Sequence, residues 1–295
     1  MKKIVLPIVL ITLTLSGSLY AQKPRASVPL KHGAHRIGVR TDSEMKRWRE
    51  HGLGQFIHWG VYAIPGGQWN GKTSTYAAEW FRSPGLIAPE EYDNLYKQFN
   101  PVNFDAKAWA KQAKQMGAKY MIFTTKHHDG FCLWPSKYTD YTIANSPYKK
   151  DIVGEIVNAY SAEGIDVHLY FSIIDWSHPG YQTGAPKEEF LRNNDWKSYR
   201  PFKTKTDSIR YQSFKEFTRN QLIELLTNYP KIKGLWFDGT WDGAWMKEAE
   251  WVDNLGRELR DMHPELIIGS RFRADEKGQR HIDTNGDLID DYDQR

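Results

Sequence analysis

The sequence contains a single cysteine in 295 residues, so no disulfide bond can form within the chain. It also lacks a strong excess of one charge. The 40 Lys and Arg residues against 36 Asp and Glu give a net charge of +4, too balanced for a protein that grips nucleic acid electrostatically. No apolar run reaches the roughly 20 residues that a membrane span requires. The fold must therefore be held by its core, in which we expect Cys132 to be a small buried residue.

Motifs of two common enzyme classes are missing as well. No G-x-G-x-x-G follows the first predicted strand, where the turn has the sequence WGVY, so a dinucleotide-binding sheet is disfavoured. No H-E-x-x-H or other spacing typical of metal ligands occurs, so we predict no metal. Aromatic residues are abundant instead, at 14%, with 12 tryptophans. They can fill a core, but so many tryptophans also suit a ligand with flat C–H faces, such as a sugar.

The N-terminus has the three parts of a secretory signal. Lys2 and Lys3 precede an apolar stretch over residues 4–15, and Ala21 is a suitable residue before a cleavage site. The apolar stretch is too short for the alternative, a membrane anchor. We therefore expect a signal peptide over 1–21, an entry segment over 22–45, a catalytic domain over 46–295, and an exported protein, periplasmic or extracellular.

Apolar runs and helical spacings alternate along the middle of the chain. Strands are predicted over residues 53–59, 119–125, 166–173, 234–237 and 266–269, and helices over 105–116, 151–160, 208–229 and 247–262. This alternation predicts parallel strands joined by crossover helices, in either an open doubly wound sheet or a (β/α)₈ barrel. Because the glycine-rich turn is missing, we favour the α/β class with a TIM-barrel architecture.

The number of strands falls short of a complete barrel. A sixth strand is expected near residues 286–291, whereas a (β/α)₈ barrel has eight. The sequence thus predicts a barrel that is incomplete at its C-terminus, such as a fragment. An irregular barrel whose last strands leave no clear pattern is the alternative.

Residues suited to chemistry follow each predicted strand. In such barrels the active site lies at the C-terminal ends of the strands. The sequence places there His58, Lys126, His127, His128, Asp129, Tyr170, Asp175, Asp238 and Arg271, and the segment after the first strand adds Trp69, Glu79 and Trp80. We interpret this gathering of imidazoles, rings, a carboxylate and a guanidinium as a binding or catalytic site.

Each of these residues also has a purely structural interpretation. His58 suits a buried, hydrogen-bonded core histidine, and Asp238 before Gly239 suits a turn. Asp129 and Asp175 are expected to brace loops, and Arg273 competes with Arg271 for any substrate role. On a regular strand His127 and His128 would face opposite sides, which argues against a shared metal unless the chain turns there.

Four segments resemble the α-L-fucosidases of glycoside hydrolase family 29. They are FIHWGVYAIPGGQW, KYMIFTTKHHDGFCLWPSKYTDY, LYFSIIDWSHP and ELLTNYPKIKGLWFDGTW, and the similarity runs from about residue 52 to 271. The resemblance implies a retaining exo-α-L-fucosidase without cofactor, which releases terminal fucose from glycans. It implies that Asp238 is the nucleophile and that His58, Glu79, Trp80, His127, His128, Tyr170 and Arg271 bind fucose, with Trp69 a further candidate against the apolar face of the sugar.

A retaining glycosidase needs a second carboxyl group as acid and base. In the family it is a glutamate after a Gly-Asp-Tyr-like stretch, and the comparable stretch here is residues 290–293. Asp293 is one candidate and a residue beyond Arg295 is another, so the acid/base stays unassigned. If it were absent, the alternative is a non-catalytic fucose-binding barrel. The expected partner is a fucosylated glycan, with no nucleic acid and no membrane anchor after signal removal.

Overall fold

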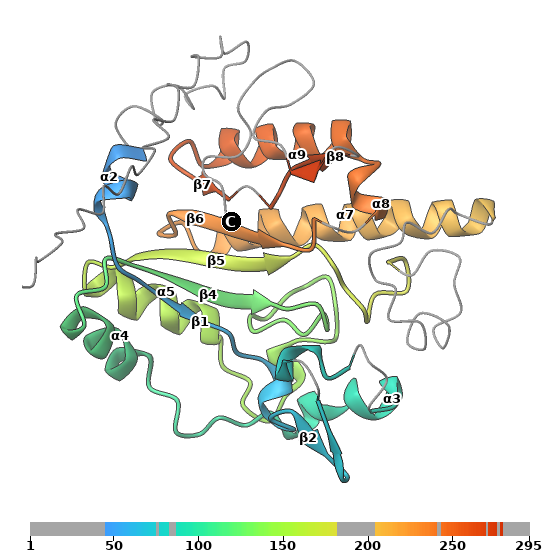
Figure 1. Ribbon diagram of the computed structural model, residues 1–295, viewed down its shortest axis with the longest axis horizontal. Helices are drawn as coiled ribbons and strands as arrows, with labels where there is room; N and C mark the ends of the chain where they lie inside the picture. Colours follow the sequence, from blue (N-terminus) through green and yellow to red (C-terminus); the bar gives the residue numbers. More distant parts are fainter. Residues whose placement is uncertain are drawn as a thin grey trace, which may run out of the picture.

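The computed structural model describes residues 45–74, 77–82, 87–181, 204–240, 243–269, 271–275 and 278–279. At its centre lies a parallel sheet of β1 (Gly54–Ile57), β4 (Tyr120–Lys126), β5 (Asp166–Ser172), β6 (Gly234–Asp238) and β7 (Ile267–Ile268), in that order (Figure 1). All five strands that we predicted with helical connections are confirmed. The predictions for residues 1–21, 22–44 and 286–291, and Asp293, lie outside the described residues.

Four helices connect successive strands, as predicted: α4 (Ala106–Gln115), α5 (Ile152–Ala162), α7 (Lys205–Asn228) and α9 (Ala249–Met262). The side chain of Asp105 caps α4 by accepting a hydrogen bond from the backbone N–H of Ala108, and Asp151 caps α5 in the same way through Gly154. Gly117, with φ +87°, takes the left-handed conformation that ends α4.

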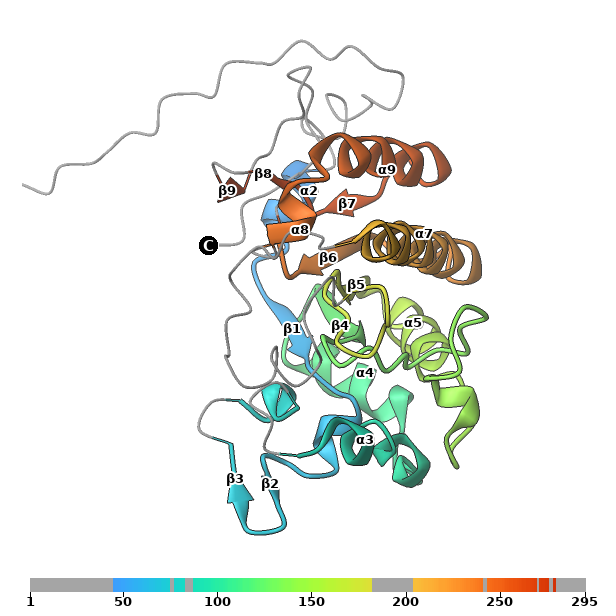
Figure 2. The same ribbon diagram turned by 90° about the vertical axis from the view of Figure 1, so that its right-hand side faces the viewer.

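The strand order decides between the two architectures. Sequential strands are neighbours throughout the sheet, and α5, α7 and α9 lie on one side of it (Figure 2). A doubly wound sheet would reverse its order at a switch point and carry helices on both faces. The fold is therefore α/β, with the single winding of a (β/α)₈-type barrel.

Residues alternate between the two faces of β5. Val167, Leu169 and Phe171 belong to the main hydrophobic core. Tyr170 and Ser172, at the alternate positions, face the other way and bond to polar groups at the ends of neighbouring strands. Strand β5 thus packs on the core with one face and presents polar side chains at the end of the other.

Smaller elements surround this frame. Helix α2 (Met45–Glu50) precedes β1, and between β1 and α4 lie the hairpin of β2 (Gln68–Trp69) and β3 (Lys72–Thr73), a 3₁₀ turn at Ala78–Trp80, and α3 (Pro89–Tyr92). Helix α8 (Gly243–Met246) and the hairpin of β8 (Ala274–Asp275) and β9 (Gly278–Gln279) follow β6 and β7. Among the described residues, no helix is both long and apolar enough to cross a membrane. Cys132 is fully buried, as expected.

Candidate active site

The carboxylate of Asp238 stands at the end of β6 and is held at both of its oxygens. Arg271 lies 2.7 Å from Oδ1, which also accepts the backbone N–H of Gly239 at 3.1 Å. The hydroxyl of Tyr170 donates to Oδ2 at 2.8 Å. A guanidinium and two hydrogen-bond donors on one carboxylate fix its orientation. Asp238 is therefore a buried, oriented carboxylate.

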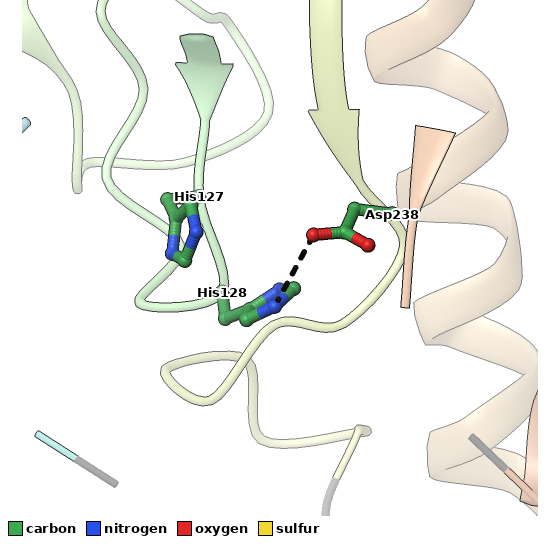
Figure 3. A group of neighbouring side chains, drawn as sticks. All are labelled: His127, His128 and Asp238. Atoms are coloured by element: carbon green, nitrogen blue, oxygen red, sulfur yellow. Dashed lines mark ion pairs between the residues drawn. The ribbon is translucent and has the colours of Figure 1, made fainter. Parts of the chain in front are cut away.

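His128, the second residue after β4, points toward this carboxylate, and His127 lies beside it (Figure 3). Nε2 of His128 lies 3.7 Å from Oδ2 of Asp238, and the rings of His127 and His128 are centred 4.3 Å apart. The alternation that would place them on opposite sides of a regular strand does not apply, because the strand ends at Lys126 and the chain turns, the exception that the sequence analysis allowed. A bulge at Thr125 shifts the register of β4 on β5, and the chain then turns over residues 127–130.

Gly130 makes this turn possible. Its φ of +87° is the left-handed region, and a Cβ there would lie 2.2 Å from Oγ of Ser177 and 2.3 Å from Oδ1 of Asp175. We predict that Gly130→Ala lowers the free energy of unfolding by roughly 2–4 kcal/mol, from backbone strain plus the steric clash. Gly117→Ala is the matched control, because Gly117 has the same φ but open space around it, and should cost only about 1 kcal/mol. Equal losses in urea unfolding of the two variants would contradict this account.

The two histidines are uncharged over the ordinary pH range. Burial lowers the pKa of His128 to about 3, with help from His58, Arg271 and Lys126. Burial and the two neighbouring histidines also bring the pKa of His127 well below its usual value. A neutral imidazole can both donate and accept a hydrogen bond, which suits the hydroxyl groups of a ligand.

Rings assemble the rest of the site. His127 stacks on Tyr170 with ring centroids 5.5 Å apart, and His58 meets the same tyrosine edge-on at 5.1 Å. Desolvation lowers the pKa of the partly exposed His58, and the charges of Glu79 and Asp238 offset part of this shift. Glu79 thus lies within electrostatic reach of His58.

Tryptophans border the histidines on one side. Trp80 contacts the ring of His128 edge-on at 4.9 Å and that of Trp176 at 5.3 Å. Trp69 is not placed in this group. Its indole N–H bonds to Glu91 at 2.6 Å, and its ring packs on the main core from β2. The structure thus gathers the predicted residues His58, Glu79, Trp80, His127, His128, Tyr170, Asp238 and Arg271, but gives Trp69 a different partner.

Two residues of the site, Trp236 and Ser172, were missed by sequence reasoning, whereas Trp176 was expected at the end of its strand. Trp236 stacks on Tyr170 at 5.2 Å and lies 5.3 Å from the guanidinium of Arg271. Ser172 lies with its Oγ 2.5 Å from Nδ1 of His128, and Trp176 packs on the same ring. The two missed residues could have been found, since Trp236 and Ser172 stand two positions from Asp238 and Tyr170 and so share their faces.

The competing structural interpretations are also resolved. Arg273 is buried against Asp253, with its Nε 2.9 Å from Oδ1, so Arg271 is the arginine that reaches Asp238. Asp129 accepts from Tyr92 and from the backbone N–H of Phe131, and Asp175 braces the loop after β5, both as expected.

The cluster was also tested as a metal site. One ligand atom each of His127, His128 and Asp238 lies within 4.8 Å of the others. However, the carboxylate already carries the guanidinium of Arg271 and the O–H of Tyr170, and a positive charge opposes a second cation beside it. The donor set fits a polar organic ligand better than a metal. An oriented carboxylate anion facing neutral imidazoles and aromatic rings suits nucleophilic attack on a bound sugar.

Comparison with known proteins gives a consistent result. The family model described as alpha-L-fucosidase matches residues 34–293. Alpha-L-fucosidase 1 of Arabidopsis thaliana is 29% identical over 247 residues, 80% of this chain and 39% of that protein. Human tissue alpha-L-fucosidase is 29% identical over 201 residues, 64% of this chain and 38% of that protein.

Solved structures show the same likeness. An alpha-L-fucosidase of glycoside hydrolase family 29 from Bacteroides thetaiotaomicron has 49% identity and a TM-score of 0.74, over 91% of this chain and 54% of that one. A trapped covalent intermediate from the same organism, in complex with 2-fluoro-fucosyl fluoride, has 48% identity and a TM-score of 0.75, over 91% of this chain and 55% of that one. The chain thus spans about two fifths of the length of these curated relatives and about half of these solved chains.

Proposed function

The chain belongs to the alpha-L-fucosidase family, and on that premise we propose that it is a retaining exo-α-L-fucosidase that removes terminal fucose from glycans. The observation that carries the proposal is the carboxylate of Asp238, held by Arg271 and Tyr170 beside two neutral histidines. The trapped covalent intermediate of the relative from Bacteroides thetaiotaomicron supports a retaining route.

In the proposed first step an oxygen of Asp238 attacks the anomeric carbon of fucose. The new C–O bond forms as the bond to the glycan oxygen breaks, and the departing oxygen takes a proton from the acid/base carboxyl group. In the second step that same group, now a carboxylate, takes a proton from water as the water oxygen attacks the anomeric carbon, and the bond to Asp238 breaks, which releases fucose with its original configuration. Asp293 is the candidate acid/base within the sequence and lies outside the described residues.

The remaining residues are proposed to hold the sugar. His58, His127, His128 and Glu79 would bond to its hydroxyl groups, and Trp80 would pack against its apolar face and methyl group. A contact of Trp69 with the sugar stays a prediction, and its indole N–H is bonded to Glu91. No metal or cofactor takes part in the proposed reaction.

Arg271 provides one test of this assignment. We predict that Arg271→Met lowers kcat/KM for an aryl α-L-fucoside about 10–100-fold, because a charged hydrogen bond to the nucleophile contributes roughly 1.5–3 kcal/mol. Arg273→Met is the matched control. It should reduce thermal stability, since it removes the buried ion pair with Asp253, but change kcat/KM of the folded enzyme less than about twofold. Equal kinetic losses in the two variants would remove Arg271 from the site.

The proposed function is tested by the rate of aryl α-L-fucoside hydrolysis and the anomer first released, observed by proton NMR. We expect turnover that a chelator does not inhibit, with α-L-fucose as the first product. Fucose binding without turnover in a folded chain would favour the alternative, a fucose-binding barrel. Inhibition by the chelator would favour a metal-dependent hydrolase.

Export is part of the proposal. The charged start, apolar stretch and Ala21 support a signal peptide over residues 1–21 and a periplasmic or extracellular location, where fucosylated glycans are accessible.

A further inference from the structure

A fully buried ion pair lies directly behind the two histidines. Lys126, the last residue of β4, has its Nζ 3.1 Å from Oδ2 of Asp175 and 3.1 Å from Oε1 of Gln221 on α7. The bulge in β4 turns this side chain toward the helices, where its ammonium lies 4.4 Å from the ring centre of Phe171. Lys126 therefore faces away from Asp238 and does not line the proposed site.

Asp175 joins this lysine to the loop after β5. Its Oδ2 receives Lys126, while its Oδ1 accepts the backbone N–H groups of Ser177 and His178 and the hydroxyl of Ser177. Burial is the largest single influence and would raise the pKa of Asp175, but Lys126, His178 and the hydrogen bond from Ser177 together outweigh it, so the pKa lies below its ordinary value. The two charged groups thus bond to each other, and each also has hydrogen-bond partners, Lys126 on α7 and Asp175 in the loop.

The loop that Asp175 organises holds His128 in turn. The backbone N–H of Trp176 donates to the carbonyl oxygen of His128 at 2.8 Å, and the two rings pack 5.4 Å apart. The missing side chain of Gly130 lets Asp175 approach the turn closely. The ion pair therefore fixes the end of β4 and the loop after β5 against each other, with His128 between them.

We propose that Lys126 and Asp175 form a positioning pair, which sets the distance between His128 and Asp238 and thereby acts on the reaction without touching the sugar. The inference rests on the proposed function. Replacing a buried ion pair by well-packed apolar residues of similar volume often leaves the stability of a protein unchanged or raises it. A gain in stability therefore does not explain why charged residues occupy these two positions. What the charges add is direction, because each hydrogen bond of Lys126 and Asp175 constrains one end of the turn or loop.

The proposal is tested by whether Lys126 acts through His128. Lys126→Met removes the charge at similar length and should lower kcat/KM for an aryl α-L-fucoside about tenfold or more. In a His128→Ala background the same substitution should change kcat/KM less than about twofold, because residues that act through one another are not additive. Equal fold-changes in the two backgrounds would overturn the proposal.

A second variant covers the case in which Lys126→Met does not fold. Lys126→Met combined with Asp175→Asn leaves no unpaired buried charge, and the asparagine oxygen can still accept from Ser177 and His178. It should show the same dependence on His128. Lys215→Met is the matched control, since Lys215 on α7 is also buried against a carboxylate, that of Glu248, and lies over the ring of Trp251. Its small effect on kcat/KM should be equal with and without His128.

Failure of the proposed function is recognised separately. If the folded parent hydrolyses no fucoside, that function is wrong, and the same variants are compared by their affinity for L-fucose in calorimetry. A loss of affinity that depends on His128 would support the positioning pair, and an additive loss or no binding at all would overturn it.

Discussion

Replacing Asp238 with glycine should abolish hydrolysis of an aryl α-L-fucoside, by about 10³-fold or more. No other described carboxylate is held by Arg271 and Tyr170 as Asp238 is, and without it the proposed covalent intermediate cannot form. The smaller side chain leaves room beside the anomeric carbon without adding strain. The loss should therefore lie in kcat, while the melting temperature changes little.

Azide provides the control that separates a nucleophile from a residue that only orients others. An azide ion in the space vacated by Asp238 can attack the anomeric carbon from the same side, forming a carbon–nitrogen bond as the aryl group leaves. We expect β-fucosyl azide from Asp238→Gly and a rate that rises with azide concentration. Arg271→Met should gain nothing from azide. A variant that keeps more than about a tenth of the parent rate would show that Asp238 is not the nucleophile.

The free energy of unfolding should fall steeply as the pH drops from about 7 to about 4. Burial lowers the pKa of both His128 and His168 to about 3 and brings the pKa of His127 well below 6.5. Between these pH values the unfolded histidines bind protons that the folded ones do not. These histidines therefore leave the free energy of unfolding unchanged above about pH 6.5 and lower it progressively as the pH falls toward 3.

The size of this effect follows from proton counting. Each such histidine changes the free energy of unfolding by about 1.4 kcal/mol per pH unit. Asp129 acts in the opposite direction, because burial raises its pKa to about 7 and its folded form keeps a proton that the unfolded form loses. The two histidines with a pKa of about 3, against one carboxyl group, leave roughly 1.4 kcal/mol per pH unit, and His127 adds to this in the same direction.

His168→Leu tests the contribution of one of these histidines at a position outside the proposed active site. His168 lies near the N-terminal end of β5 and contacts the rings of Trp48 and Tyr120. Neither of its ring nitrogens has a hydrogen-bond partner among the described residues. The variant should match or exceed the stability of the parent at pH 8 and lose about 1.4 kcal/mol less per pH unit below pH 6. Parallel curves from urea unfolding at several pH values would mean that His168 titrates alike in both states.

The fold was largely predictable, because each strand of the sheet is a short apolar run and each connecting helix carries a periodic apolar face. The ends of α4 and α5 could be placed since aspartates precede both helices and Gly117 and Gly164 follow them. The region between β1 and α4 left no comparable pattern. It folds as short helical turns and a hairpin of two two-residue strands, whose positions depend on contacts with the rest of the chain.

The site was predictable to the extent that it follows the regular strands. Asp238 and Tyr170 were placed at the same end of the sheet by the rule that barrels act at the C-terminal ends of their strands. The approach of His127 to His128 was not, because it depends on a bulge at Thr125 and a tight turn at Gly130. Trp69 shows the converse, since a tryptophan near the site found a different partner in Glu91.

The most direct test of the account is the mass of the chain after reaction with 2-fluoro-fucosyl fluoride, the compound in the trapped intermediate of the relative. The fluorine at C2 slows release of the sugar, so the covalent enzyme accumulates. We predict one added fluorofucosyl group per chain, located by peptide mapping on Asp238 and lost in Asp238→Gly. An unmodified folded chain, or a sugar attached to another residue, would contradict the assignment of Asp238 as the nucleophile.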